Sequence, residues 1–120
     1  RIDDPRLAVN YDPSNAVVAG EDPIALLDAV LPRVHSMHAS DRYLKPGVSW
    51  DDLRERRLGY ASGLVHGVIG EGINDYDAIL SRLAGAGFDG WISLEDGMNG
   101  LPDMKKSVDF LREKIARHFG

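Results

Sequence analysis

Three short apolar segments that alternate with helical patterns constrain the fold of this chain more than any other feature. The segments are residues 7–11, 33–39 and 91–94. The turn formers that begin at Asp12 end the first segment, and Glu95 ends the third. Strands that alternate with helices are typical of consecutive βα units in a parallel sheet. The order therefore predicts an α/β fold.

Helix signals support this order. Asp22 precedes Pro23 and predicts a helix that ends at Pro32, because an N-cap acid followed by proline is a common helix start. Asn74 is the expected N-cap of the next helix, which ends at glycines. An apolar stripe at helical spacing closes the chain, formed by Met104, Val108, Leu111, Ile115 and Phe119.

Residues 40–72 interrupt the pattern, because connections in such units are usually about two to six residues long. Ser49 begins a capping box that predicts a short helix to about Leu58. Long loops of this kind often carry function, so we expect an ordered lid over the carboxyl ends of the strands. A surface excursion without a role is the alternative.

Three parallel strands alone make a poor domain, because each outer strand presents an unpaired edge. A (β/α)₈ barrel needs about 250 residues, and three βα units would be its last three. The chain starts at Arg1 without Met and soon reaches a strand. We therefore expect residues 1–120 to be the C-terminal part of such a barrel, strands six to eight, with self-association or an upstream half as its partner.

Composition excludes several classes of protein. The chain has no Cys, which rules out disulfides, zinc ribbons and cysteine nucleophiles. Its net charge of −5 disfavours nucleic acid as a partner, since that binding depends on Lys and Arg. No apolar run approaches the roughly 18 residues of a membrane span, and no leader pattern opens the chain. A soluble protein in the cytoplasm is expected.

Metal-binding side chains follow or end the three predicted strands. Asp12 follows the first, His38 lies near the end of the second and Glu95 closes the third. Each alone has a plain structural reading, as a turn former, a structural histidine or a solvated acid. Together they would meet at one edge of a parallel sheet, where barrels hold their active sites. Oxygen and imidazole donors suit Mn²⁺, Mg²⁺, Co²⁺ or Zn²⁺.

Four segments carry a family resemblance: residues 10–15 (NYDPSN), 37–41 (MHASD), 70–76 (GEGINDY) and 87–95 (GFDGWISLE). In this order they resemble the C-terminal part of the xylose-isomerase-like TIM barrels, the sugar phosphate isomerase/epimerase family. The resemblance implies that Asp12, His38 and Glu95 are metal ligands on strands six, seven and eight. A fourth ligand, a Glu on strand five, has no counterpart in the chain.

The resemblance also implies a reaction. A divalent ion that binds adjacent carbonyl and hydroxyl oxygens of a sugar makes the neighbouring C–H acidic, and an enediolate forms. Carboxylates then move the proton, one on each face for epimerisation. Glu95 is expected to be both ligand and catalytic acid/base in a metal-dependent isomerase or epimerase.

Other residues are candidates for binding the sugar. Asn15 stands where the family often has His, and it suits a sugar hydroxyl better than a metal. Ser40 stands where the family often has Lys, which weakens a phosphate contact, although Arg42 lies close by. His66 lies in the long loop and is a candidate for the mouth of the site. The glycines of residues 70–72 could receive an anion at a helix start, but Glu71 favours a plain turn.

Three alternatives remain at the level of sequence. A sugar-acid dehydratase or lyase would use the same proton abstraction and then expel a β-hydroxyl. An abasic-site endonuclease-like phosphodiesterase shares the barrel, but Asn15 and the negative charge count against it. A non-catalytic fragment that oligomerises through its open edges is the third.

Overall fold

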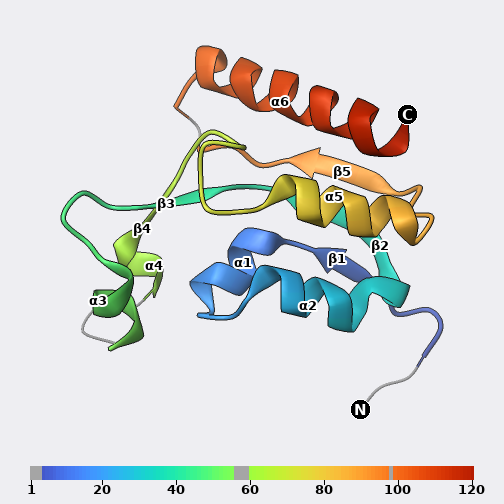
Figure 1. Cartoon of the computed structure of the whole chain (residues 1–120), viewed down its shortest axis with the longest axis horizontal. Coiled ribbons are helices and arrows are strands. Elements are labelled where there is room, and N and C mark those ends of the chain that lie inside the picture. The colour runs from blue at the N-terminus through green and yellow to red at the C-terminus, as the bar shows by residue number, and fades with distance from the viewer. Residues whose placement is uncertain (1–3, 56–59, 98) are drawn as a thin grey trace.

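The computed structural model describes residues 4–55, 60–97 and 99–120. A three-stranded parallel sheet lies at the centre of the protein (Figure 1). Its strand order is β1-β2-β5, and a second, two-stranded sheet pairs β3 with β4 in antiparallel fashion. The strands are β1 (Val9–Tyr11), β2 (Val34–Ala39), β3 (Arg42–Leu44), β4 (Leu64–His66) and β5 (Trp91–Leu94). The helices are α1 (Pro13–Val18), α2 (Pro23–Val30), α3 (Trp50–Arg54), α4 (Tyr60–Gly63), α5 (Tyr76–Gly85) and α6 (Leu101–Phe119), with a 3₁₀ turn η1 (Leu31–Arg33) after α2.

Both pairings in the main sheet are parallel, which confirms the predicted α/β fold. β2 is the central strand, so Asn10 pairs with Ser36 on one side and His38 with Ser93 on the other. The first strand is shorter than its sequence suggested, since residues 7 and 8 lie outside it. Leu7 is half exposed and adds nothing to the core.

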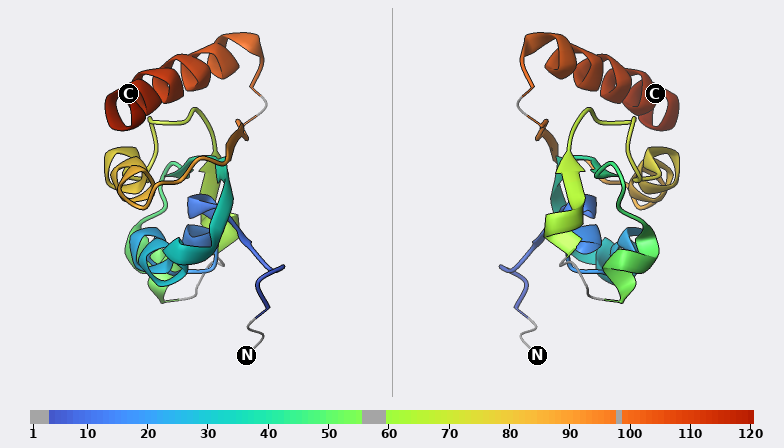
Figure 2. Two further views of the ribbon diagram at one scale, coloured as in Figure 1. Left: turned by 90° about the vertical axis from the view of Figure 1, so that its right-hand side faces the viewer. Right: turned by 90° about the vertical axis from the view of Figure 1, so that its left-hand side faces the viewer.

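The two faces of the sheet differ sharply. Met37 and Ala39 are fully buried under the helices, and His38 between them points to the opposite face because side chains alternate along a strand. Figure 2 shows α2, α5 and α6 gathered on one side of the sheet. On the other face Trp91 is 84% exposed. The described residues therefore cover the sheet on one face only.

Helix starts follow the predicted chemistry, with two corrections. Asp22 caps α2 as expected. Asp12 also caps a helix, α1, where the sequence suggested only a turn; the Asp-Pro signal is the same in both places. Asn74 is not the N-cap of α5, because Asp75 accepts the capping bond from the Ala78 N–H at 2.9 Å. The Asn74 side chain is buried and bonds elsewhere.

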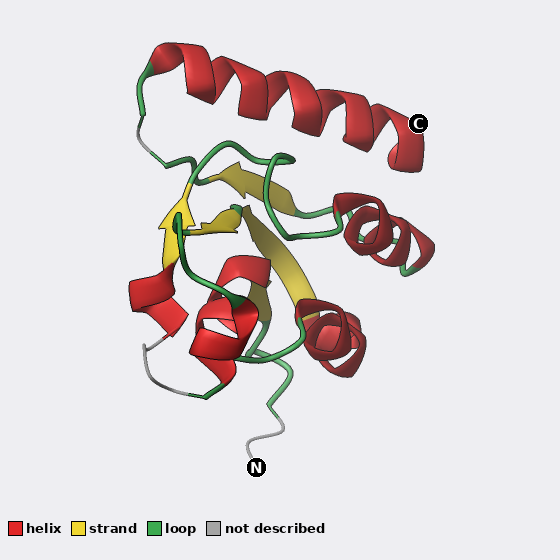
Figure 3. Ribbon diagram, turned by 60° about the vertical axis from the view of Figure 1, so that its left-hand side comes forward, coloured by secondary structure: helices red, strands yellow, loops and turns green. Residues whose placement is uncertain are grey.

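The described part of the predicted loop 40–72, residues 40–55 and 60–72, forms an excursion at the carboxyl side of the sheet, where the arrowheads of β1 and β5 point in Figure 1. Ser49 forms the expected capping box at the start of α3. The helix ends at Arg54, earlier than the end expected near Leu58, which itself lies outside the described residues. The β3–β4 hairpin and α4 were not predicted. Figure 3 brings this side of the molecule forward.

Two apolar clusters hold the structure together. The larger lies between the sheet and its helices and includes Tyr11, Met37 and Leu80. The smaller joins the excursion to α1 through Val17 and Leu53. α6 packs beside α5, and within the described residues no helix combines the length and apolar character needed to cross a membrane.

Candidate metal centre

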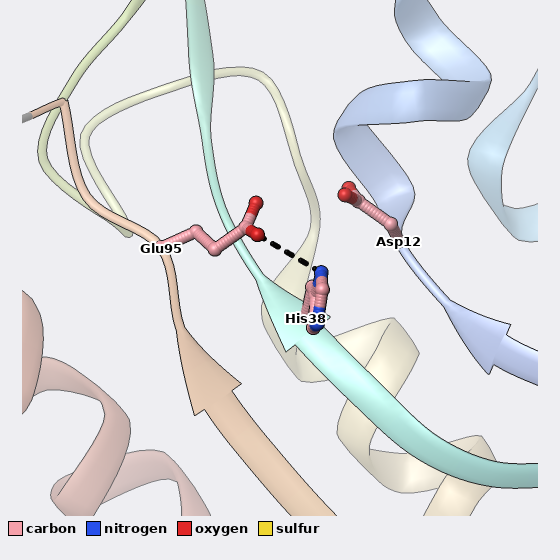
Figure 4. A group of neighbouring side chains, drawn as sticks. All are labelled: Asp12, His38 and Glu95. Carbon is pink, nitrogen blue, oxygen red and sulfur yellow. Dashed lines mark ion pairs between the residues drawn. The ribbon is translucent and has the colours of Figure 1, made fainter.

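The carboxyl ends of the three parallel strands bring Asp12, His38 and Glu95 together (Figure 4). Each offers one donor atom, and these three atoms all lie within 4.8 Å of one another. The predicted convergence is therefore present. It follows from topology, because residues at the ends of adjacent parallel strands share one edge of the sheet.

Asp12 is held by its own helix. Its Oδ1 accepts hydrogen bonds from the backbone N–H groups of Ser14 at 2.9 Å and Asn15 at 3.2 Å. The Ser40 hydroxyl donates to the same oxygen at 3.0 Å. A carboxylate that caps a helix in this way has a fixed orientation. The side chain points from the start of α1 toward the other two donors.

His38 and Glu95 form the other half of the cluster. His38 Nδ1 lies 3.0 Å from Glu95 Oε1, and both side chains are partly exposed. The Glu95 N–H donates to the Ala39 carbonyl at 2.8 Å, which extends the β2–β5 ladder by one residue. This bond therefore fixes the backbone position of Glu95, while its side chain extends over the open face of the sheet.

The donor set fits a divalent cation. Metal–ligand bonds of about 2.0 to 2.6 Å place ligand atoms of one ion roughly 3 to 5 Å apart, according to whether they are neighbours or opposite. The spacing of these three atoms falls in that range. Two carboxylates and one imidazole also supply the negative charge and the mixed O and N donors that Mn²⁺, Co²⁺ and Zn²⁺ accept.

Comparison with known proteins agrees with this architecture. The family model for the xylose isomerase-like TIM barrel matches residues 1–114. This chain belongs to the xylose isomerase-like TIM barrel family. Its three parallel strands are thus part of a (β/α)₈ barrel, present here as a partial barrel.

Curated relatives within the xylose isomerase-like proteins are enzymes. Inosose dehydratase of Bacillus thuringiensis (strain Al Hakam) is 27% identical over 114 residues, which cover 88% of this chain and 37% of the relative. Inosose dehydratase of Bacillus anthracis (strain CDC 684 / NRRL 3495) is 29% identical over 122 residues, covering 94% and 40%. The chain thus spans about two fifths of the length of these relatives.

Solved structures of the xylose isomerase-like fold superpose on nearly the whole chain. A xylose isomerase domain protein from Planctomyces limnophilus gives a TM-score of 0.75 at 24% identity, covering 97% of this chain and 38% of that one. A D-tagatose 3-epimerase-like protein gives 0.67 at 25% identity, covering 97% and 37%. Mannonate dehydratase from Streptococcus suis serotype2 gives 0.70 at 15% identity, covering 98% and 34%.

The three predicted sugar-binding residues differ in how they contact the candidate metal centre. His66 Nε2 lies 2.9 Å from the backbone carbonyl oxygen of Glu95. Asn15 is exposed on α1, and its backbone N–H donates to Asp12 Oδ1 at 3.2 Å. Arg42 is half-buried on β3, opposite His66 in the hairpin, and its Nε has no partner among the described residues.

The turn at residues 70–72 receives an anion, but the anion belongs to the chain itself. Gly70 and Gly72 donate their N–H groups to Asp41 Oδ2 at 2.9 and 3.1 Å. The N–H groups of Arg42 and Asn74 donate to Oδ1 at 3.0 and 3.1 Å. Burial raises the pKa of Asp41, and these four donors oppose that rise. The sequence favoured a plain turn over an anion site here, and it did not indicate that Asp41 occupies the turn.

Proposed function

We propose that the protein is a divalent-metal-dependent isomerase or epimerase of a sugar or sugar derivative. The observation that carries this proposal is the convergence of Asp12, His38 and Glu95 at the carboxyl ends of adjacent parallel strands. Such an edge is where barrel enzymes bind their substrates. The described residues leave this face of the sheet uncovered, so a small polar substrate can approach the three donors from that side.

A bound divalent ion would polarise a substrate carbonyl and make the neighbouring C–H more acidic. Asp12, His38 and Glu95 would hold the ion. Glu95 is also the residue that we assign to proton transfer. Its side chain is 44% exposed and extends over the open face. Its backbone is fixed twice, because its N–H bonds to the Ala39 carbonyl and its carbonyl bonds to the His66 ring.

The hydroxyl-binding role fits residues near the donors. His66 contacts the backbone of Glu95 from the hairpin, and the hollow beside it is lined by His66, Leu94, Glu95, Asp96 and Gly97. Asn15 and Arg42 lie on the flanking α1 and β3, where a larger sugar would reach them. The excursion that carries Arg42 and His66 would act as a lid.

A dehydratase acting on a sugar or cyclic polyol derivative is the second candidate. It is favoured by the curated relatives, which are named inosose dehydratases. Both reactions begin when a base removes the proton next to a carbonyl. They differ in the second step, because a dehydratase loses a β-hydroxyl as water and an epimerase returns the proton.

Solvent exchange tests the proposal directly. The full-length protein is incubated with Mn²⁺ and a panel of ketoses, aldoses and keto-inositols in D₂O, and the carbon-bound protons are followed by NMR. We expect deuterium to enter next to the carbonyl of one substrate, together with an epimer, an isomer or a dehydrated product that identifies the reaction. Exchange should stop in a chelator.

Glu95→Gln is the decisive variant, and Glu21→Gln is its control. Glu21 is exposed near α2 and is not part of the cluster. We expect Glu95→Gln to lower the exchange rate by at least about 100-fold, the usual effect of losing a general acid or base. Glu21→Gln should react like the wild type. Equal exchange by Glu95→Gln and wild type would refute the assignment.

A further inference from the structure

Ser40 lies at the centre of a buried hydrogen-bond network beside the candidate metal centre. Its side chain is 1% exposed, directly after the last residue of β2. The hydroxyl donates to Asp12 Oδ1 at 3.0 Å. The backbone carbonyl accepts bonds from Asn74 Nδ2 at 3.1 Å and from the Tyr76 hydroxyl at 2.8 Å. Ser40 therefore joins the end of β2 to both α1 and the start of α5.

The network fixes the backbone of Ser40 independently of its side chain. Asn74 and Tyr76 are buried, and at Ser40 both contact the carbonyl oxygen rather than the hydroxyl. Burial also raises the pKa of the Tyr76 phenol, so its hydroxyl stays protonated and remains a donor. Consequently the Ser40 hydroxyl starts from a fixed position when it meets Asp12.

The contact with Asp12 is selective for one oxygen. Oδ1 receives three donors, two from the start of α1 and one from Ser40. Among the described residues no hydrogen bond reaches Oδ2. The two backbone donors come from Asp12's own helix, and only Ser40 ties the carboxylate to the strand that carries His38. This asymmetry leaves the lone pairs of Oδ2 available to a cation.

We infer that Ser40 is a positioning residue that orients Asp12 so that this carboxylate offers a single oxygen, Oδ2, to the metal. The inference rests on the proposed metal site. It adds a role for a residue that is not itself one of the three candidate ligands. Groups that orient metal ligands in this way usually change metal affinity by about 10- to 100-fold when they are removed. Ser40 couples the ligand on α1 to the ligand on β2.

Mn²⁺ affinity, measured through the electron paramagnetic resonance signal of the free ion, tests the inference. Ser40→Ala removes the hydroxyl and keeps the carbonyl that Asn74 and Tyr76 bind. We expect it to weaken Mn²⁺ binding by roughly tenfold. Ser40→Thr keeps a hydroxyl and should restore most of the affinity. Ser107→Ala is the matched control, because Ser107 is another fully buried serine whose hydroxyl accepts one hydrogen bond, from the Ile69 N–H.

A metal-free measurement covers the case in which Ser40→Thr does not fold. Urea unfolding is compared for wild type, Ser40→Ala, Asp12→Ala and the double variant. We expect Ser40→Ala to lower the unfolding midpoint in the wild-type background and to have a much smaller effect when Asp12 is already absent. Equal effects in both backgrounds would mean that the two residues are not coupled.

The outcomes separate the inference from the function that it rests on. Wild-type protein that binds no Mn²⁺ refutes the metal site and the role of Ser40 together. Wild-type protein that binds Mn²⁺ no more tightly than Ser40→Ala refutes the role of Ser40 alone. If Ser107→Ala weakens binding as much as Ser40→Ala, the effect is a general loss of packing and the inference is wrong.

Discussion

Asp41 is a fully buried carboxylate, and burial of such a group is costly unless hydrogen-bond donors surround it. Four backbone N–H groups supply them, two to each oxygen. Gly72 cannot carry a side chain here, since a Cβ at this position would lie 2.3 Å from Asp41 Oδ1. The carboxylate therefore joins the end of β2 to the turn that precedes α5.

Asp41→Asn should destabilise the fold strongly. The amide keeps one acceptor oxygen and replaces the other with a donor, so two of the four buried N–H groups lose their acceptor. We expect a loss of about 3 kcal/mol in the free energy of unfolding, measured with urea. Asp51→Asn, on the exposed face of α3, is the control and should cost less than about 1 kcal/mol. Similar losses in the two variants would contradict this account.

The three candidate metal donors could be predicted from sequence because a local signal, the end of a strand, marks each one. A strand pattern indicates where Asp12, His38 and Glu95 lie, and parallel topology brings strand ends together. The partners of Asp41 could not be predicted in the same way. Three of the four come from residues about 30 positions away, and only the fold of the excursion brings Gly70, Gly72 and Asn74 back to the sheet.

At the level of elements, α5 and α6 are joined by one acidic residue. Asp77 in α5 pairs with Lys114 at 2.6 Å and with His118 at 2.9 Å, both in α6. These partners lower the pKa of Asp77 to about 2. A lowered pKa means that the ionised side chain stabilises the folded state above the ordinary aspartate range near pH 4, and that this contribution is lost as the pH falls toward 2.

Asp77→Asn should therefore lower the melting temperature near neutral pH and have a progressively smaller effect between pH 4 and pH 2. Differential scanning calorimetry at several pH values measures the difference from wild type. Asp109→Asn serves as the control, because Asp109 pairs with Lys105 inside α6 and, among the described residues, forms no ion pair with another element. A pH-independent difference for Asp77→Asn would show that its charge does not matter.

Element prediction succeeded where a pattern repeats and failed where elements are short. α6 extends over many turns, and its apolar stripe was visible in the sequence. α1 was missed because Asp12-Pro13 also reads as a strand-ending turn. The strands of the β3–β4 hairpin have three residues each, which is too few for a periodic signal.

At the level of the whole molecule, both outer strands of the described sheet have an unpaired edge. Trp91 on β5 is 84% exposed, beside a hollow lined by Phe88, Ile92 and Phe119. Unpaired edges with apolar side chains favour pairing with another chain. We expect the 120-residue chain to self-associate, and light scattering after size-exclusion chromatography should show species larger than the monomer.

Trp91→Lys should shift that distribution toward the monomer, because a charged side chain disfavours edge pairing. Leu101→Lys is the matched control, since Leu101 is 78% exposed but lies at the start of α6. A wild-type chain that stays monomeric at high concentration would contradict the expectation.

Turnover is expected to need more than these 120 residues. A segment supplying the remaining βα units would close the barrel and could add a second carboxylate for proton transfer. We expect the chain alone to be almost inactive, and a mixture with the complementary segment to regain turnover. Glu95→Gln should prevent this recovery while leaving the association intact. Full activity of the isolated monomer with added Mn²⁺ would contradict this prediction.

The hydrogen bonds from residues 70–74 to Asp41 also affect where the chain can accept insertions. They pin the two ends of the excursion together, and the bond from the Lys45 N–H to the Gly63 carbonyl closes its inner part. The entropy lost on closing a flexible loop grows only logarithmically with its length, by about 0.6 kcal/mol for each doubling. Insertions at the exposed residues 46 and 47 should therefore cost little, whereas exchange of the segment that carries the buried Leu53 would remove its contact with Val17. Length can thus vary at this turn while the sheet stays constant.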